Sequence, residues 1–373
     1  MAKLVSRVMR RAFLAVLLPG LLLVLASAIA RAAAAPDRLS TEMDRWAAFL
    51  RTNESTDDTW KQLKAGAEPL MAQAQAALAS GRRLLALQRF LAARAQLSAA
   101  AYAQAPPARA AKDAGGFEAE WTRMGGALGD RLARPSPGAL DGVRPAVLRA
   151  LGEVALPQSR VFYDASLEYG RATMPEYGLH YLGQARSAGE TVDLCRALAE
   201  PGGERPPGVR SVGSEIEALE EEMLAAYRPP LSVDRHAEFI AASAQLKEAR
   251  ELDGLGLGHG ALLRYLQAAQ RFWPLREARG SGAAAGRDAE PLGGRIRAFE
   301  KRFATSGADH SLGRLFLERA QEAVAASPPE TEIAQAIVSD VLPRYLHALE
   351  PARPRPPGRD PAFTVTLVRW PYT

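Results

Sequence analysis

The sequence predicts an all-α protein, built as a repeat- or solenoid-like array of helical hairpins and followed by an extended C-terminal segment. Apolar residues recur at helical spacing through most of the chain, and proline- and glycine-rich joints interrupt this pattern at fairly even intervals. A similar aromatic-Leu motif closes each interval. Only one segment, near the C-terminus, alternates apolar and polar residues as a half-buried strand does.

The first 35 residues have the order of a secretory signal peptide: a basic start, an uncharged apolar run and small residues at the end. An N-terminal membrane anchor is the alternative, because roughly 20 apolar residues can span a bilayer. Cleavage is favoured by Pro19-Gly20, which interrupts the run, and by the alanines that follow it. We therefore expect residues 1–35 to be removed, leaving an exported, periplasmic or secreted protein with no membrane span.

Charge and cysteine content narrow the classes of function. The chain has 47 basic and 42 acidic side chains, and five of the basic ones lie in the leader, so the mature protein is formally neutral. A nucleic-acid-binding protein normally needs an excess of positive charge, and we expect no nucleic-acid partner. Cys195 is the only cysteine, so the chain cannot form an internal disulfide, and we expect a small buried thiol.

The proline- and glycine-rich joints divide the mature chain into four helical units, which span 37–103, 117–198, 214–277 and 295–350. We group them into two helical regions and a tail: units 1 and 2 (37–198), units 3 and 4 (214–350), and a Pro-rich joint with an extended tail (351–373). Within each unit we predict three helices. The first helix opens with Trp46 in unit 1, Trp121 in unit 2, Ile216 in unit 3 and Ile296 in unit 4.

Each unit ends in an aromatic residue followed by Leu and, within a few positions, by Ala. The aromatic residues are Phe90, Tyr181, Tyr265 and Tyr345. An aromatic ring fills volume and Ala lets two backbones approach, so we expect the three tyrosines to be buried at helix–helix contacts. The alternative is that Ala-rich amphipathic helices look alike without forming a true repeat.

The last two helices of each unit resemble the helical hairpin of tetratricopeptide repeats. In the first unit Ala74, Ala86, Phe90 and Ala93 match that family's spacing of small and aromatic positions, and Tyr345–Pro351 is similar to its closing helix and terminal proline. The Trp and Tyr of the family's first helix are missing and the units are longer. The resemblance covers about half of the mature chain and implies a protein-binding scaffold.

The sequence contains no recognisable catalytic signature. No histidine stands in an H-E-x-x-H arrangement, and His236-Ala237-Glu238 matches only a fragment of the zinc-deaminase signature. The glycines of 254–260 lack the Lys-Ser/Thr of a phosphate-binding loop, and we expect a turn between helices there. We therefore assign no catalytic, cofactor-binding or metal-binding residue. A site assembled from distant carboxylates and arginines stays open.

The C-terminal tail carries the candidate partner-binding residues Phe363, Val365, Leu367, Trp370 and Tyr372. The first three alternate with polar residues, and the rest of the chain shows no strand pattern for them to pair with. The tail could dock along a groove of this protein, add a strand to a partner's sheet, or stay in solvent.

Together these patterns predict an exported, periplasmic helical scaffold that binds another protein or peptide of the cell envelope. The alternative function is an exported all-α enzyme that acts on an envelope glycan or lipid.

Overall fold

A computed structural model describes residues 37–53, 58–105, 108, 111, 113–171, 175–199, 206–227, 233–280 and 291–350. The leader and the C-terminal tail lie outside these ranges. Every regular element within them is helical, which confirms the predicted all-α class.

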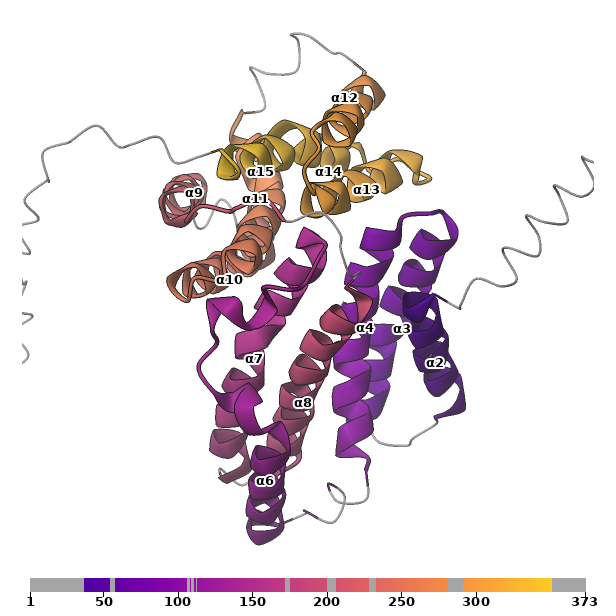
Figure 1. The fold of residues 1–373 in the computed structure, drawn as a ribbon, viewed down its shortest axis with the longest axis vertical. Coiled ribbons are helices and arrows are strands. Elements are labelled where there is room, and N and C mark those ends of the chain that lie inside the picture. Colours follow the sequence, from indigo (N-terminus) through magenta and orange to yellow (C-terminus); the bar gives the residue numbers. More distant parts are fainter. Residues whose placement is uncertain are drawn as a thin grey trace, which may run out of the picture.

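The first half of the chain forms the helices in the lower part of Figure 1. They are α2 (Arg38–Thr52), α3 (Asp58–Ala79), α4 (Arg83–Ala103), α6 (Ala114–Leu128), α7 (Ala146–Arg171) and α8 (Pro175–Leu198). The second half lies across their upper ends. It contains α9 (Gly213–Ala226), α10 (His236–Gly254), α11 (Gly258–Gly280), α12 (Leu292–Thr305), α13 (Ser311–Ala325), α14 (Thr331–Ala336), the π-helix η4 (Ile337–Val341) and α15 (Leu342–Ala348).

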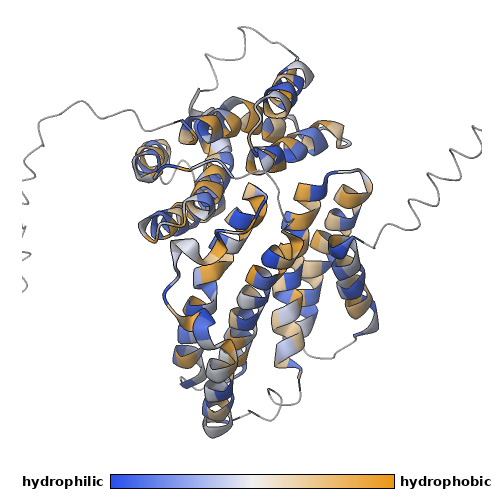
Figure 2. Ribbon diagram, in the orientation of Figure 1, coloured by the Kyte–Doolittle hydropathy of each residue, from blue (hydrophilic) through white to orange (hydrophobic). Residues whose placement is uncertain are grey.

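Three helical hairpins form the centre of the molecule, namely α3–α4, α7–α8 and α10–α11, and α4 packs on α8 while α7 packs on α11. Figure 2 shows apolar residues recurring along these helices in bands, as helices that bury one face require. At Gly183 the backbones of α8 and α4 approach closely, because a Cβ atom there would lie only 2.7 Å from the carbonyl oxygen of Ala99. Glycine is therefore needed where α8 crosses α4.

The aromatic-Leu motifs lie in this core, with one exception. Tyr265 and Tyr345 are fully buried, as the sequence predicts, and Phe90 is buried as well. The prediction is wrong for Tyr181, which is only partly buried and stacks on the exposed Tyr169 with ring centroids 4.8 Å apart. Its neighbour Leu182 takes the core position instead and is fully buried.

Two other local predictions are confirmed. The glycine-rich segment is the turn between α10 and α11, and Gly256 has a φ of +74°, a left-handed conformation that favours glycine. Cys195 is fully buried, and burial raises the pKa of its thiol to about 12, so the thiol stays protonated and unreactive.

Among the described residues, no helix combines the length and the apolar character needed to cross a membrane.

The core position of Leu266 gives a direct test of this packing. We expect Leu266→Ala to lower the free energy of unfolding by about 2–5 kcal/mol, because a fully buried leucine leaves a cavity when truncated. The matched control is Leu224→Ala, whose side chain is 62% exposed and which should cost less than about 0.5 kcal/mol. Urea denaturation measures both, and equal losses would show that α11 is not packed as described.

Candidate functional site

Side chains of the second half of the chain cap two helices of the first half. The first backbone N–H groups of any helix lack partners within the helix and need an acceptor when they are buried. At the start of α7, a carboxylate oxygen of Asp309 accepts from the Ala146 N–H, and the Ser311 hydroxyl accepts from Val147 at 3.0 Å. At the start of α4, Glu318 accepts from the Leu85 N–H at 2.8 Å.

A third buried carboxylate joins α7 to the start of α11. Glu153 is 1% exposed, and its two oxygens accept from the Gly260 N–H and from Arg149 Nε, both at 2.8 Å. A Cβ atom at Gly260 would lie 2.9 Å from the Glu153 side chain, so only glycine allows this contact. His259 lies beside it, and burial lowers the pKa of its imidazole. Its Nε2 therefore donates to the Pro207 carbonyl at 3.2 Å as the neutral form.

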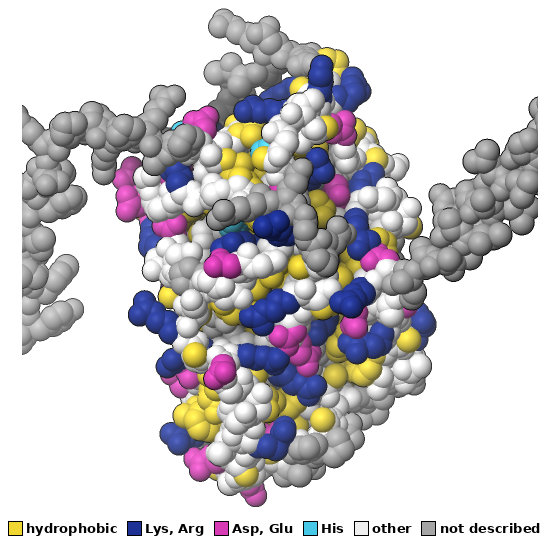
Figure 3. All heavy atoms as spheres, viewed as in Figure 1, with side chains coloured by type: hydrophobic (Ala, Val, Ile, Leu, Met, Phe, Trp, Pro, Cys, Tyr) yellow, Lys and Arg dark blue, Asp and Glu magenta, His cyan; other side chains and the backbone are white. Residues whose placement is uncertain are grey.

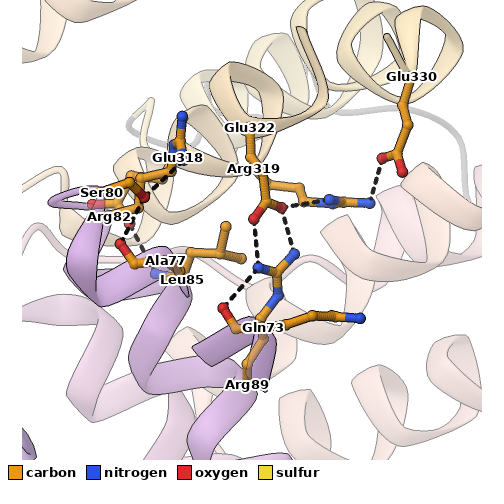
Figure 4. A network of polar contacts seen from close by, with 10 residues as sticks. All are labelled: Gln73, Ala77, Ser80, Arg82, Leu85, Arg89, Glu318, Arg319, Glu322 and Glu330. Carbon is orange, nitrogen blue, oxygen red and sulfur yellow. Dashed lines mark hydrogen bonds and ion pairs between the residues drawn. The ribbon is translucent and has the colours of Figure 1, made fainter. Parts of the chain in front are cut away.

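An ion-pair network ties α13 to α4 next to these caps (Figure 4). Arg89 binds both carboxylate oxygens of Glu322, Arg319 donates to the same carboxylate at 2.6 Å, and it also donates to Glu330 at 2.9 Å. Burial alone would raise the pKa of Glu322, but hydrogen bonds from the two arginines outweigh it and hold that pKa below its usual value. The network joins α13 to α4 and, through Glu330, to the start of α14.

The caps and ion pairs frame two adjoining cavities, of about 390 and 490 Å³, which share five lining residues: Gln88, Arg89, Gln245, Gln267 and Arg271. We call the joined cavities the glutamine groove. Its smaller part is walled by α3, α4, α10, α11 and α13, and its larger part by α3, α4, α7, α8, α10 and α11. The groove therefore lies where both halves of the chain meet.

Glutamine is concentrated here to an unusual degree. Eight of the chain's thirteen glutamines line the groove: Gln73, Gln88, Gln96, Gln158, Gln184, Gln245, Gln267 and Gln270. Apolar side chains such as Leu91, Val154 and Leu263 form the floor between them. Each glutamine amide offers two donors and one acceptor oxygen, so the groove is a neutral hydrogen-bonding surface on an apolar base.

Several polar atoms in the groove lack a hydrogen-bond partner. Within the described part of the chain, the side-chain oxygens of Gln184, Ser187 and Gln245 are buried and unpartnered. Ser187 is only 1% exposed and lines the larger part of the groove. Buried polar atoms are normally hydrogen-bonded, and an orphaned group costs about 1–3 kcal/mol. A ligand that donates N–H or O–H groups would satisfy these acceptors.

Most arginines of the groove are paired with carboxylates just outside its lining, since Arg89 and Arg319 bind Glu322. Its lining includes Arg89, Arg264, Arg271 and Arg319, and none of the described residues that line it is acidic. Arg264 is paired with Glu248 at 2.7 Å, outside the lining, while Arg271 makes no hydrogen bond or ion pair within the described ranges. Elsewhere the surface is mixed, since acidic and basic side chains are interspersed over the face in Figure 3.

Aromatic residues continue the groove beyond its larger part. Phe162 lines that part, its ring centroid is 6.2 Å from that of Tyr181, and Tyr181 stacks on Tyr169. Tyr169 and Tyr177 are 43% and 58% exposed. We call Phe162, Tyr169 and Tyr181 the aromatic shelf. Tyr181 is only partly buried because its ring stacks on the exposed Tyr169.

A third cavity, of about 470 Å³, lies at the helix caps and contains Asp309, His310 and Glu318. It is the place where distant carboxylates and arginines do converge, as the enzyme alternative requires. Burial raises the pKa of Glu318, which a general acid would need. However, Asp309 and Glu318 both accept backbone N–H groups of helix starts, so their oxygens are engaged in capping.

The residues singled out from the sequence do not meet at the groove. The tail residues Phe363, Val365, Leu367, Trp370 and Tyr372 lie outside the described ranges. His236 is remote from it and hydrogen-bonds Tyr227 at 2.7 Å. Within the described ranges, no group of three or more His, Cys, Asp and Glu side chains is placed to hold a metal ion.

Sequence reasoning missed the groove, although one signal was present. Gln184 and Gln267 follow the aromatic-Leu motifs, at the boundary between buried and open faces of their helices.

Comparison with protein-family models, with curated proteins and with solved structures gave no match to this chain.

The carboxylate of Glu322, which Arg89 and Arg319 share, allows a test of how much this ion-pair network stabilises the fold. Because its pKa is lowered in the folded state, its stabilisation is present above the unfolded value, near 4.5, and is lost as the pH falls through the folded-state pKa. We expect Glu322→Gln to cost about 1–3 kcal/mol at neutral pH and progressively less on acidification. Urea unfolding across this pH range measures the difference.

The matched control is Glu330→Gln. Among the described residues the Glu330 side chain pairs with Arg319 alone, and it is 45% exposed, so its loss should cost under about 0.5 kcal/mol. Similar losses of unfolding free energy for the two variants at neutral pH would show that Glu322 stabilises the fold no more than an exposed ion pair does.

Proposed function

We propose that this protein is an exported, periplasmic scaffold that binds an extended peptide segment of another envelope protein in the glutamine groove. The single observation that carries the proposal is the cluster of glutamines with unpartnered oxygens, including the neighbouring Ser187 hydroxyl, over an apolar floor. Export is supported by the signal-peptide order of residues 1–35. N-terminal sequencing of the mature protein tests that part.

An extended peptide suits the groove because its backbone presents N–H and C=O groups along its whole length. Glutamine amides can bond both kinds of group, and the apolar floor takes side chains from one face of the peptide. Along α4 the lining runs from Leu85 to Gln96, which is about 16 Å of helix. That length matches about five residues of extended chain at roughly 3.3 Å each.

A repeat organisation fits this role. In the proposal, the four units of the sequence correspond to α2–α4, α6–α8, α9–α11 and the helices from α12 onward, each with a hairpin that contributes one wall of the groove. Arrays of helical hairpins form extended concave binding surfaces in this way. The tetratricopeptide-like spacing of Ala74, Ala86, Phe90 and Ala93 supports the same interpretation.

The enzyme alternative has less support. Hydrolysis of a glycan typically uses two carboxyl groups that flank the bond, and the described lining of the groove contains no Asp or Glu. The carboxylates of the third cavity are held by helix N–H groups. Binding is therefore the activity that the geometry supports best.

Filling the groove should abolish partner binding without unfolding the protein. Ala92 is exposed on α4 and lines the larger part of the groove, so Ala92→Trp places an indole where the peptide would lie. We expect a drop of at least about tenfold in recovery of the partner from periplasmic extracts, measured by quantitative mass spectrometry.

The matched control is Ala76→Trp, at an exposed residue of α3 that is not part of the groove lining. It should recover the partner like the parent protein, and circular dichroism should show that both variants are folded. If a partner is recovered equally with parent, Ala92→Trp and Ala76→Trp, the binding surface is elsewhere and the groove assignment is wrong.

A further inference from the structure

We propose that the glutamine groove has an internal ligand, the protein's own segment 363–368, which occupies the groove and must be displaced by the partner. The inference goes beyond the proposed function, because it concerns how the site is filled when no partner is bound. Its observations are the chemistry of the groove, the point at which the chain leaves the described structure, and the composition of the chain that follows.

The groove needs a ligand with hydrogen-bond donors, an apolar face and no strong positive charge. The unpartnered oxygens of Gln184, Ser187 and Gln245 require donors. The floor is apolar, no acidic residue among those described lines the groove, and of its four arginines only Arg271 has no carboxylate partner among the described residues. An uncharged extended segment with apolar residues on one face meets all three conditions.

Segment 363–368 has this composition. It reads Phe-Thr-Val-Thr-Leu-Val and contains no charged residue, whereas the basic residues of the C-terminal region lie on either side of it. Phe363, Val365 and Leu367 alternate with threonines, so an extended backbone would turn the apolar three toward one face. Six residues also match a groove about five extended residues long.

No strand exists among the described residues to satisfy the backbone of this segment. An extended segment in water has its N–H and C=O groups solvated, but its apolar face stays exposed. Docking buries that face, and the glutamine amides replace the lost water on the backbone. The groove and the segment therefore each supply the groups that the other lacks.

The chain leaves the described structure one helix away from the groove, because α15 contacts the side of α11 that carries Tyr265 and the groove residues of α11 lie on its other side. α15 packs on α11, where Arg344 donates to the Tyr265 hydroxyl at 2.7 Å, and residues of α11 such as Leu263 and Gln267 line the groove. The twelve residues 351–362 are rich in proline. At about 3.1 Å per residue in a polyproline conformation, they span roughly 37 Å. A helix with its side chains is about 10–12 Å across, so the linker is long enough to pass around α11 and reach the groove.

Tethering makes the internal ligand effective even if its contacts are few. A segment joined by a short linker is present at an effective concentration in the millimolar range. An external peptide of the same intrinsic affinity would be excluded at lower concentrations. The segment would thus raise the affinity that a true partner needs, and so restrict the groove to ligands that bind more tightly.

Hydrogen–deuterium exchange of the full chain, read by mass spectrometry on peptides that cover 363–368, tests the proposal. In the parent protein we expect these amides to exchange at least about tenfold more slowly than an unstructured chain. In Ala92→Trp, whose indole fills the groove, they should exchange at the unstructured rate. In Ala76→Trp they should stay protected, because that residue does not line the groove.

Two results would overturn the proposal. Exchange of 363–368 at the unstructured rate in the parent protein would show that the segment is undocked. Protection that persists in Ala92→Trp would show that it docks outside the groove. Neither result bears on the partner recovery that tests the proposed function, so the two proposals fail independently.

Discussion

Buried helix starts are the constraint on which the rest of this structure depends. Where one helix begins inside the protein, its first N–H groups need acceptors that its own turn cannot supply. Glu153, Asp309 and Glu318 provide them for α11, α7 and α4, in each case from a part of the chain far away in sequence. These contacts hold the two halves of the molecule in one arrangement, because sliding either half would orphan a buried donor.

The groove is a consequence of that arrangement. Its walls come from hairpins of both halves, so its shape depends on the angle at which α11 and α13 meet α4 and α7. The Arg89–Glu322 pair joins α13 to α4 beside the groove. The same frame holds the oxygens of Gln184 and Gln245 at the groove, where the donors of a ligand can reach them.

The chemistry of the groove argues for recognition of main chain over side chain. The glutamine amides and the Ser187 hydroxyl can bond backbone N–H and C=O groups, which every peptide has. The apolar floor adds affinity with modest selectivity. Arg89, Arg264 and Arg319 are paired with carboxylates, so Arg271 is the arginine of the lining that disfavours basic ligands. Such a surface would accept many extended segments, and an internal competitor is one physical means of raising its selectivity.

The sequence by itself determined the helical class, the turn at Gly256 and the burial of Cys195, Tyr265 and Tyr345. These features follow from local periodicity and composition, which act within one or two helices. Only the tertiary structure decided that Tyr181 lies on an open aromatic shelf and that eight glutamines from separate helices face one groove. Convergence of this kind depends on how distant helices pack, and that is set by long-range caps and ion pairs that leave no periodic trace in the sequence.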